Sequence, residues 1–220
     1  TTDQTGIRIT DTTYPYKIEG VRISDFKGCG VSYQSTGVTP HTGPRINAVY
    51  VTACSFGLYV PARAEYLQVS NSTFFANDIG HYIVGGNFHC SNSDITDNIT
   101  YGVYLAAGTN HAHGCYTGCS LNHNGNITTG FSIYADTIIN GMLFTGCDIY
   151  GGLYLNACSG IVIEGGKGYL WITMSGTMAG MNFVRNFEFS DGDKTITATA
   201  PQRLLLSVEN CVLGNAGNYV

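Results

Sequence analysis

Thr117-Gly118-Cys119-Ser120-Leu121 and Thr145-Gly146-Cys147-Asp148-Ile149 are two copies of one pentapeptide, 28 residues apart. Four further segments have the same pattern of small, polar and apolar residues: 52–56, 70–74, 91–95 and 209–213. The copies therefore end at positions 56, 74, 95, 121, 149 and 213, and weaker copies end at 28, 168 and 189. Successive ends are 18 to 28 residues apart, which is typical of a solenoid whose repeats carry insertions.

Strand signals flank most copies of the pentapeptide. Apolar residues alternate in segments such as Leu67-x-Val69 and Ile161-x-Ile163, with the two-residue period of a β-strand. A second strand opened by glycine follows, as in Gly102-Val103-Tyr104-Leu105. Each repeat thus reads as strand, tight bend, strand and variable turn. We predict an all-β chain that forms a parallel β-helix of about nine coils.

The predicted boundaries place the β-helix at residues 18–213. Residues 1–17 are expected to be an N-terminal lead-in, and residues 214–220 a C-terminal tail. The first residues read like a cut through a longer chain, so we expect a fragment of a larger protein. The Leu-x-x-Leu-x-Leu frame of leucine-rich repeats is missing. A β-sandwich would not repeat a pentapeptide in register.

The composition excludes several classes of protein. Only 25 of 220 residues are charged, which is 11%, against about 25% in an average domain. A hydrophobic share of 44% excludes disorder, and no apolar run approaches the roughly 18 residues of a membrane span. A net charge of −5 without a Lys/Arg cluster argues against a nucleic-acid partner. A surface that is polar through Ser, Thr, Asn, Gly and Tyr suits a wet, uncharged partner such as carbohydrate, or simply a tough exterior.

Alternation of side chains assigns residues to inward and outward columns. The predicted inward column at the bend comprises Phe26, Cys54, Ser72, Ser93, Cys119, Cys147, Gly166, Phe187 and Cys211. The predicted outward column just before the apolar end comprises Lys27, Ser55, Thr73, Asp94, Ser120, Asp148, Lys167 and Glu188. The predicted outward column of the second strand comprises Ser32, Tyr59, Tyr82, Tyr104, Ser132 and Tyr154.

The outward tyrosines Tyr59, Tyr82, Tyr104 and Tyr154 are the candidate carbohydrate-binding residues. Aromatic faces stack on sugar rings, and the phenol adds a hydrogen bond. A ladder that repeats on successive coils would match an extended polymer. Two alternatives stay open, because the column could also be buried in a trimer interface or be a plain exposed ladder of good strand formers.

Asp94, Asp97 and Asp148 are the candidate catalytic acids, because glycoside cleavage needs two carboxyl groups. Asp94 and Asp148 share an outward column two coils apart, which separates their backbones by about 9–10 Å. In inverting glycosidases the two carboxyl groups are about 6.5–9.5 Å apart, so this separation is at the upper edge of that range. Asp97 follows around the bend. The alternative is that these acids cap backbone amides in turns.

No metal site or cofactor is predicted. His111, His113 and Cys115 share one face of an extended strand, and Cys119 and His123 follow. Zinc would suit these residue types, but Cys119 belongs to the inward column and the set does not converge. The eight cysteines are expected to be buried free thiols, because four of them occupy one inward column.

The coil pattern resembles the right-handed parallel β-helix superfamily that includes pectate lyases and polygalacturonases. The low charge and the Gly/Ser/Thr/Tyr-rich surface resemble bacteriophage tailspike and tail receptor-binding proteins most. The Asn-Thr-Asp, Asp-Asp, Gly-His-Gly and Arg-Ile-Lys signatures of polygalacturonases are missing, so no family catalytic residue is carried over.

This resemblance implies a homotrimer on a virion that recognises bacterial capsule or O-antigen outside the cell, and that in many members also cleaves it. The first alternative is a monomeric polysaccharide hydrolase or lyase of the pectinase superfamily. The second is a purely structural β-helical spacer. Whether the protein is an enzyme stays open at this level.

Overall fold

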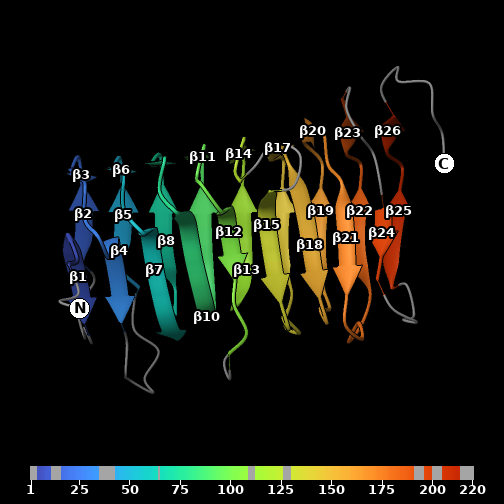
Figure 1. The fold of residues 1–220 in the computed structure, drawn as a ribbon, viewed down its shortest axis with the longest axis horizontal. Helices are drawn as coiled ribbons and strands as arrows, with labels where there is room; N and C mark the ends of the chain where they lie inside the picture. Colours follow the sequence, from blue (N-terminus) through green and yellow to red (C-terminus); the bar gives the residue numbers. More distant parts are fainter. Residues whose placement is uncertain are drawn as a thin grey trace.

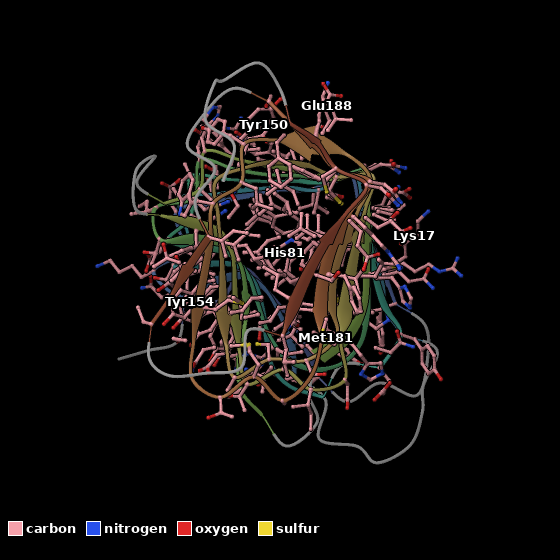
Figure 2. The ribbon with its side chains drawn as sticks, turned by 90° about the vertical axis from the view of Figure 1, so that its right-hand side faces the viewer. Lys17, His81, Tyr150, Tyr154, Met181 and Glu188 are labelled. Carbon is pink, nitrogen blue, oxygen red and sulfur yellow. The ribbon has the colours of Figure 1, made fainter. Side chains whose placement is uncertain are left out.

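The computed structural model describes residues 4–10, 16–34, 43–63, 65–108, 112–125, 130–190, 196–199 and 205–213, without the side chains of 62, 63 and 213. Its strands stack along one long axis, from the N-terminal end to the C-terminal end (Figure 1). Seen along that axis, they form walls around a filled interior in which His81 lies (Figure 2). The fold is a parallel β-solenoid.

Three walls, here named A, B and C, make up the solenoid, and β10 bends from wall A into wall B. Wall A contains β1 (Ile7–Thr10), β4 (Cys29–Gln34), β7 (Phe56–Arg63), the first part of β10 (Ile79–Ser91), β12 (Tyr101–Leu105), β15 (Phe131–Asp136), β18 (Gly152–Asn156), β21 (Ile172–Ser175) and β24 (Ile196–Ala198). Wall B contains β2 (Lys17–Glu19), β5 (Arg45–Asn47), β8 (Leu67–Ser70), the second part of β10, β13 (Ala112–Thr117), β16 (Met142–Thr145), β19 (Ile161–Glu164), β22 (Asn182–Arg185) and β25 (Leu206–Glu209). Wall C contains β3 (Arg22–Ser24), β6 (Tyr50–Thr52), β9 (Thr73–Phe75), β11 (Asp94–Thr96), β14 (Ser120–Asn122), β17 (Asp148–Tyr150), β20 (Lys167–Gly168), β23 (Glu188–Phe189) and β26 (Val212–Leu213).

Every strand pairs in parallel with the strand of the next coil, for example β11 with β14 and β14 with β17. Wall C has nine described strands, and the solenoid has about seven turns, slightly fewer than the nine or so coils predicted. In Figure 1 the strands of wall A run downward in front and those of wall B upward behind, while the chain advances from left to right. This course is that of a right-handed β-helix, so the predicted fold class is confirmed. β1, in the stretch expected to be a lead-in, pairs with β4 in wall A.

The corner between walls B and C has the same backbone conformation in every coil. One residue there has φ between 46° and 66°, the left-handed region in which glycine and asparagine cost least. These residues are Gly20, Ala48, Asn71, Asn92, Gly118, Gly146, Gly165, Asn186 and Asn210. The backbone N–H of most of them donates to a carbonyl of the next coil, as Asn92 does to Thr117 at 3.0 Å. The small second residue of the pentapeptide is therefore set by this bend.

The core consists of columns of buried apolar side chains. One column of wall A reads Val31, Leu58, His81, Val103, Ile133, Leu153 and Ile172. Within it, His81 is the one ionisable side chain, and it is fully buried between Leu58 and Val103. Its ring lies edge-on to Phe74 and Phe88, and Nδ1 is 3.2 Å from the hydroxyl of Tyr116.

A buried asparagine ladder closes the corner between walls C and A. The side-chain Oδ1 of Asn98 accepts the backbone N–H of Asn77 at 3.0 Å, and Oδ1 of Asn124 accepts that of Asn98 at 3.1 Å. Each Nδ2 donates to a carbonyl, as that of Asn98 does to Phe74 at 3.1 Å. The ladder satisfies backbone groups that the bend removes from the strand pairing.

The register of the first two coils differs from the prediction. Val51, and not Phe56, pairs with Phe74, and Ile23 pairs with Val51. Val21 and Val49 therefore replace Phe26 and Cys54 in the predicted inward column, and Arg22 and Tyr50 replace Lys27 and Ser55 in the outward one. The cause is that Ala53 occupies the other corner with φ 54°, where a left-handed residue is followed by the small Cys54. Both corners need a left-handed residue, so the pentapeptide at 52–56 matched the wrong one.

Ser132 was also wrongly placed in an outward column. The pairing of β12 with β15 aligns Tyr101 with Phe131 and Val103 with Ile133, so Ser132 takes the inward position of Gly102, for which the sequence pattern had taken Gly130. The buried Ser132 hydroxyl donates to the carbonyls of Leu121 and Tyr150 at 3.0 and 3.2 Å. Tyr134 takes the outward position instead. In the part of the chain that the structure describes, no helix is long and apolar enough to cross a membrane.

Candidate functional site

Five tyrosines form one outward column on wall A. The strand pairing aligns Tyr59 with Tyr82, Tyr82 with Tyr104, Tyr104 with Tyr134, and Tyr134 with Tyr154. The four tyrosines singled out in the sequence thus lie in a single column, and Tyr134 completes it. Only the inward turn of Ser132 brings Tyr134 into register, so the sequence pattern missed it.

The tyrosine rings touch one another along the whole column. Ring centroids are 5.3 Å apart for Tyr59 and Tyr82, 5.1 Å for Tyr82 and Tyr104, and 5.0 Å for Tyr104 and Tyr134. Tyr134 and Tyr154 are stacked at 4.5 Å with an interplanar angle of 12°. Such contacts hold each ring by its neighbours, so the column is a preorganised surface and not a set of independent side chains.

Three further aromatic side chains widen the column at the start of the strands. The distance between ring centroids is 4.8 Å for Phe56 and Tyr59, 4.8 Å for Tyr101 and Tyr134, and 5.1 Å for Phe131 and Tyr154. We call the whole surface the aromatic band. Its members are Phe56, Tyr59, Tyr82, Tyr101, Tyr104, Phe131, Tyr134 and Tyr154, and all are half-buried. The band is therefore packed from the sides and open to solvent on its outer face.

The band continues toward wall C at one corner. The Trp171 side chain lies where a side chain at Gly152 would stand, next to Phe131. Trp171 stacks with Tyr169, and Tyr169 lies edge-on to Tyr150 at 5.1 Å. Tyr150 is on β17, two residues after Asp148, so the aromatic surface reaches the wall that carries the predicted acids.

The phenols of Tyr101, Tyr104 and Tyr134 are neutral at ordinary pH, because their pKa values are raised. Burial, together with the neighbouring Tyr154 and Tyr101, raises the pKa of Tyr134 to about 12. Burial also raises the pKa of Tyr101 and Tyr104, with smaller contributions from Asp78 and Asp136 respectively. Each hydroxyl can therefore both donate and accept a hydrogen bond, as recognition of sugar hydroxyls requires.

A polar chain lies along one edge of the band, across three coils. The hydroxyls of Tyr154 and Ser175 are 2.7 Å apart, and that of Ser175 donates to Oδ1 of Asn156 at 3.0 Å. Nδ2 of Asn156 donates to Oδ1 of Asp136 at 2.8 Å, and Thr137 donates to the same oxygen at 2.9 Å. This places one carboxylate beside the aromatic surface.

The predicted acids lie on another wall. Ser120 separates Asp94 from Asp148 in one outward column of wall C, as predicted, with about 9–10 Å between the two backbones. Asp97 is exposed at the next corner with φ 53°. The four predicted tyrosines are on wall A, so the structure does not bring the two predicted sets together on one face. In Figure 2, Tyr154, Lys17 and Glu188 mark the outer sides of walls A, B and C.

Asp78 and Asp136, the carboxylates beside the band, stand at its opposite edges. Asp78 precedes β10, whereas Asp136 ends β15, and six residues of strand correspond to about 20 Å. Two glycosidase carboxyl groups are at most about 9.5 Å apart. These two acids therefore cannot act together on one bond.

The histidine-rich segment does not converge. His113 and Cys115 lie on the same face of β13, whereas Cys119 is buried in the core and His123 is exposed at a corner. His111 lies outside the described residues. Among the described residues, no group of three or more His, Cys, Asp or Glu side chains could hold a metal ion. All eight cysteines are free thiols.

No family model matches the chain, and neither a curated protein nor a solved structure does. The strand pairing therefore establishes the parallel β-solenoid by itself, and every functional statement has to rest on the residues of this chain.

Proposed function

We propose that the aromatic band binds an extended polysaccharide that lies along the solenoid axis. The observation that carries the proposal is the unbroken column of five tyrosines, in which successive rings are 4.5–5.3 Å apart. Sugar rings present apolar faces and a rim of hydroxyls, and tyrosine rings with their hydroxyl groups match both. The band has few charged neighbours, which favours recognition by stacking and hydrogen bonds over ion pairing.

Binding is favoured over cleavage at this site. Catalysis would need two carboxyl groups close to one glycosidic bond, and Asp78 and Asp136 stand too far apart. Asp136 is already held by Asn156 and Thr137, an arrangement that suits a fixed hydrogen-bond acceptor for a sugar hydroxyl.

The proposed ligand is a bacterial surface polysaccharide, capsule or O-antigen, and the proposed setting is a receptor-binding segment on a phage tail. The support is the β-solenoid with its low charge and tyrosine-rich wall, which resembles tailspikes. In such a homotrimer we expect a subunit contact that leaves the aromatic band free for glycan.

The test is a binding measurement on immobilised bacterial capsules and O-antigens with single alanine variants. Tyr82→Ala, Tyr104→Ala and Tyr134→Ala should each weaken binding about fivefold, because a lost stacking contact costs about 1 kcal/mol. Tyr66→Ala is the matched control, since Tyr66 is exposed outside the band. Equal glycan binding by the three band variants and the Tyr66→Ala control would refute the proposal. Loss of the trimer with unchanged glycan binding would indicate that the band is a subunit interface.

A second candidate function is cleavage on wall C. Asp94 and Asp148 stand about two coil spacings apart, and Tyr150 next to Asp148 connects to the aromatic surface. Product sizing after incubation with the bound polysaccharide tests this function. Shortened chains that disappear in Asp94→Ala and Asp148→Ala would support an inverting hydrolase. Polysaccharide chains of unchanged length would indicate a binding module without hydrolase activity. Absence of polysaccharide binding would indicate a structural spacer.

A further inference from the structure

A thiol and an imidazole are in contact on the outer face of wall B, away from the aromatic band. β10 and β13 pair so that His89 lies directly beside Cys115. Nδ1 of His89 is 3.1 Å from Sγ of Cys115. The alternating neighbours Phe88 and Tyr116 are fully buried, whereas His89 and Cys115 are both half-buried. The contact is therefore accessible from the outside.

Two polar side chains lie against the Cys115 sulfur. The His89 nitrogen can accept the thiol proton, and the hydroxyl of Thr117 lies 3.8 Å from Sγ as a weak donor to sulfur. β8, β10, β13 and β16, the strands packed around the pair, carry no Asp, Glu, Lys or Arg. His113 is the other outward imidazole on β13. No carboxylate of these strands competes with the thiol for the His89 imidazole.

The remaining thiols provide an internal comparison. Cys29, Cys54, Cys90, Cys119, Cys147 and Cys158 are buried. Cys211 is half-buried like Cys115, but its sulfur lies 3.6 and 3.3 Å from the carbonyl oxygens of Val184 and Glu209. Among the described residues, Cys211 is therefore a half-buried thiol whose contacts are carbonyl oxygens and not an imidazole.

We propose that Cys115 is a nucleophilic thiol site for small disulfides, with His89 as its base. His89 Nδ1 takes the thiol proton, and Sγ attacks one sulfur of the disulfide. The Cys115–S bond forms while the original S–S bond breaks, and the leaving thiolate takes up the proton from His89. The products are a mixed disulfide on Cys115 and one free small thiol, so the disulfide itself is the only oxidant.

The test measures the reaction of the folded protein with dithiobisnitrobenzoate, with the labelled cysteine identified by peptide mass. A positioned base contributes about 10²–10⁴-fold in enzyme sites. Because His89 and Cys115 are only half-buried, we expect a smaller rate enhancement than in an enzyme site. Cys115 should react at least about fivefold faster than Cys211 at neutral pH. His89→Gln should bring the Cys115 rate down to that of Cys211.

The controls separate the base from the general exposure of the thiol. His123→Gln removes an exposed imidazole on another wall and should leave the Cys115 rate unchanged. Cys115→Ser should abolish the fast phase. An unchanged Cys115 rate in His89→Gln would overturn the proposal. If that variant does not fold, a wild-type Cys115 rate at or below that of Cys211 would overturn it equally.

Discussion

The buried imidazole of His81 should make the stability of this protein depend on pH in a specific direction. Burial lowers the pKa of His81 from 6.5 to about 3, because the aromatic and aliphatic side chains around it cannot solvate a charge. In the unfolded chain the imidazole regains its ordinary pKa. Below pH 6.5 the unfolded state therefore binds one more proton than the folded state, and stability falls as pH falls toward 3.

The magnitude follows from proton linkage. One proton corresponds to about 1.4 kcal/mol of unfolding free energy per pH unit. Between pH 6.5 and 5, where few carboxyl groups titrate, His81 should account for a loss that approaches about 2 kcal/mol. Above pH 6.5 its contribution should be constant.

His81→Phe removes the titrating group while it keeps a ring in the space among Phe74, Phe88 and Tyr116. The Tyr116 hydroxyl loses the imidazole nitrogen at 3.2 Å, so we expect about 1–3 kcal/mol of destabilisation at neutral pH. The slope of stability against pH between 6.5 and 5 should nevertheless become flatter by about one proton. This slope separates titration from packing.

Urea unfolding at pH 7, 6 and 5 measures the slope for wild type, His81→Phe and the control His123→Gln. The control keeps the buried imidazole, so its profile should follow that of the wild type. Parallel pH profiles for wild type and His81→Phe would refute the reasoning, because the imidazole would then not be buried in its neutral form.

The remaining predictions concern the ladder, one corner and the band. Asn98→Ala should cost about 2–6 kcal/mol in urea unfolding, since it leaves the N–H of Asn77 and a buried carbonyl without their side-chain partner, at about 1–3 kcal/mol each. Asn87→Ala, at an outward position, should change the unfolding free energy by less than about 0.5 kcal/mol. Equal losses in Asn98→Ala and Asn87→Ala would contradict a stabilising role of the asparagine ladder. Asn92 has φ 46°, so Asn92→Val should lower the unfolding free energy by about 1–2 kcal/mol and Asn92→Gly should be tolerated, a ranking that thermal unfolding checks. In an ultraviolet titration the Tyr134 phenol should ionise near pH 12, and this ionisation should be missing in Tyr134→Phe. Because the pKa of Tyr134 is higher in the folded than in the unfolded state, the unfolding free energy should fall as pH rises from 10 toward 12.

Much of the fold was predictable because a solenoid repeats a local rule. Asn71, Asn92, Gly118 and Gly146 recur at one corner because each bend needs a left-handed residue. The alternation around Leu67 and Val69 marks the inward face in the same way. These signals depend only on the backbone conformation of neighbouring residues, so a single sequence carries them.

The alignment of distant coils was less predictable. Two corners need a left-handed residue, so Cys54 was placed in the inward column of Cys119 although it lies at the corner of the asparagine ladder. Gly130 was taken as the equivalent of Gly102, whereas Ser132 holds that position, so Tyr134 was missed in the tyrosine column. Register between coils is set by hydrogen bonds across 20 or more residues, and an insertion or bulge shifts it without a local signature.

By itself, the sequence determined the β-solenoid, the low-charge surface and the outward direction of Tyr59, Tyr82, Tyr104 and Tyr154. Only the tertiary structure decided that these rings form one continuous band with Tyr134, while Asp94 and Asp148 face another wall. It also decided that His89 touches Cys115 and that His81 is enclosed by Phe74, Phe88 and Tyr116. The physical reason is that side-chain direction follows from the local backbone, whereas contact between coils depends on the length and path of every turn between them.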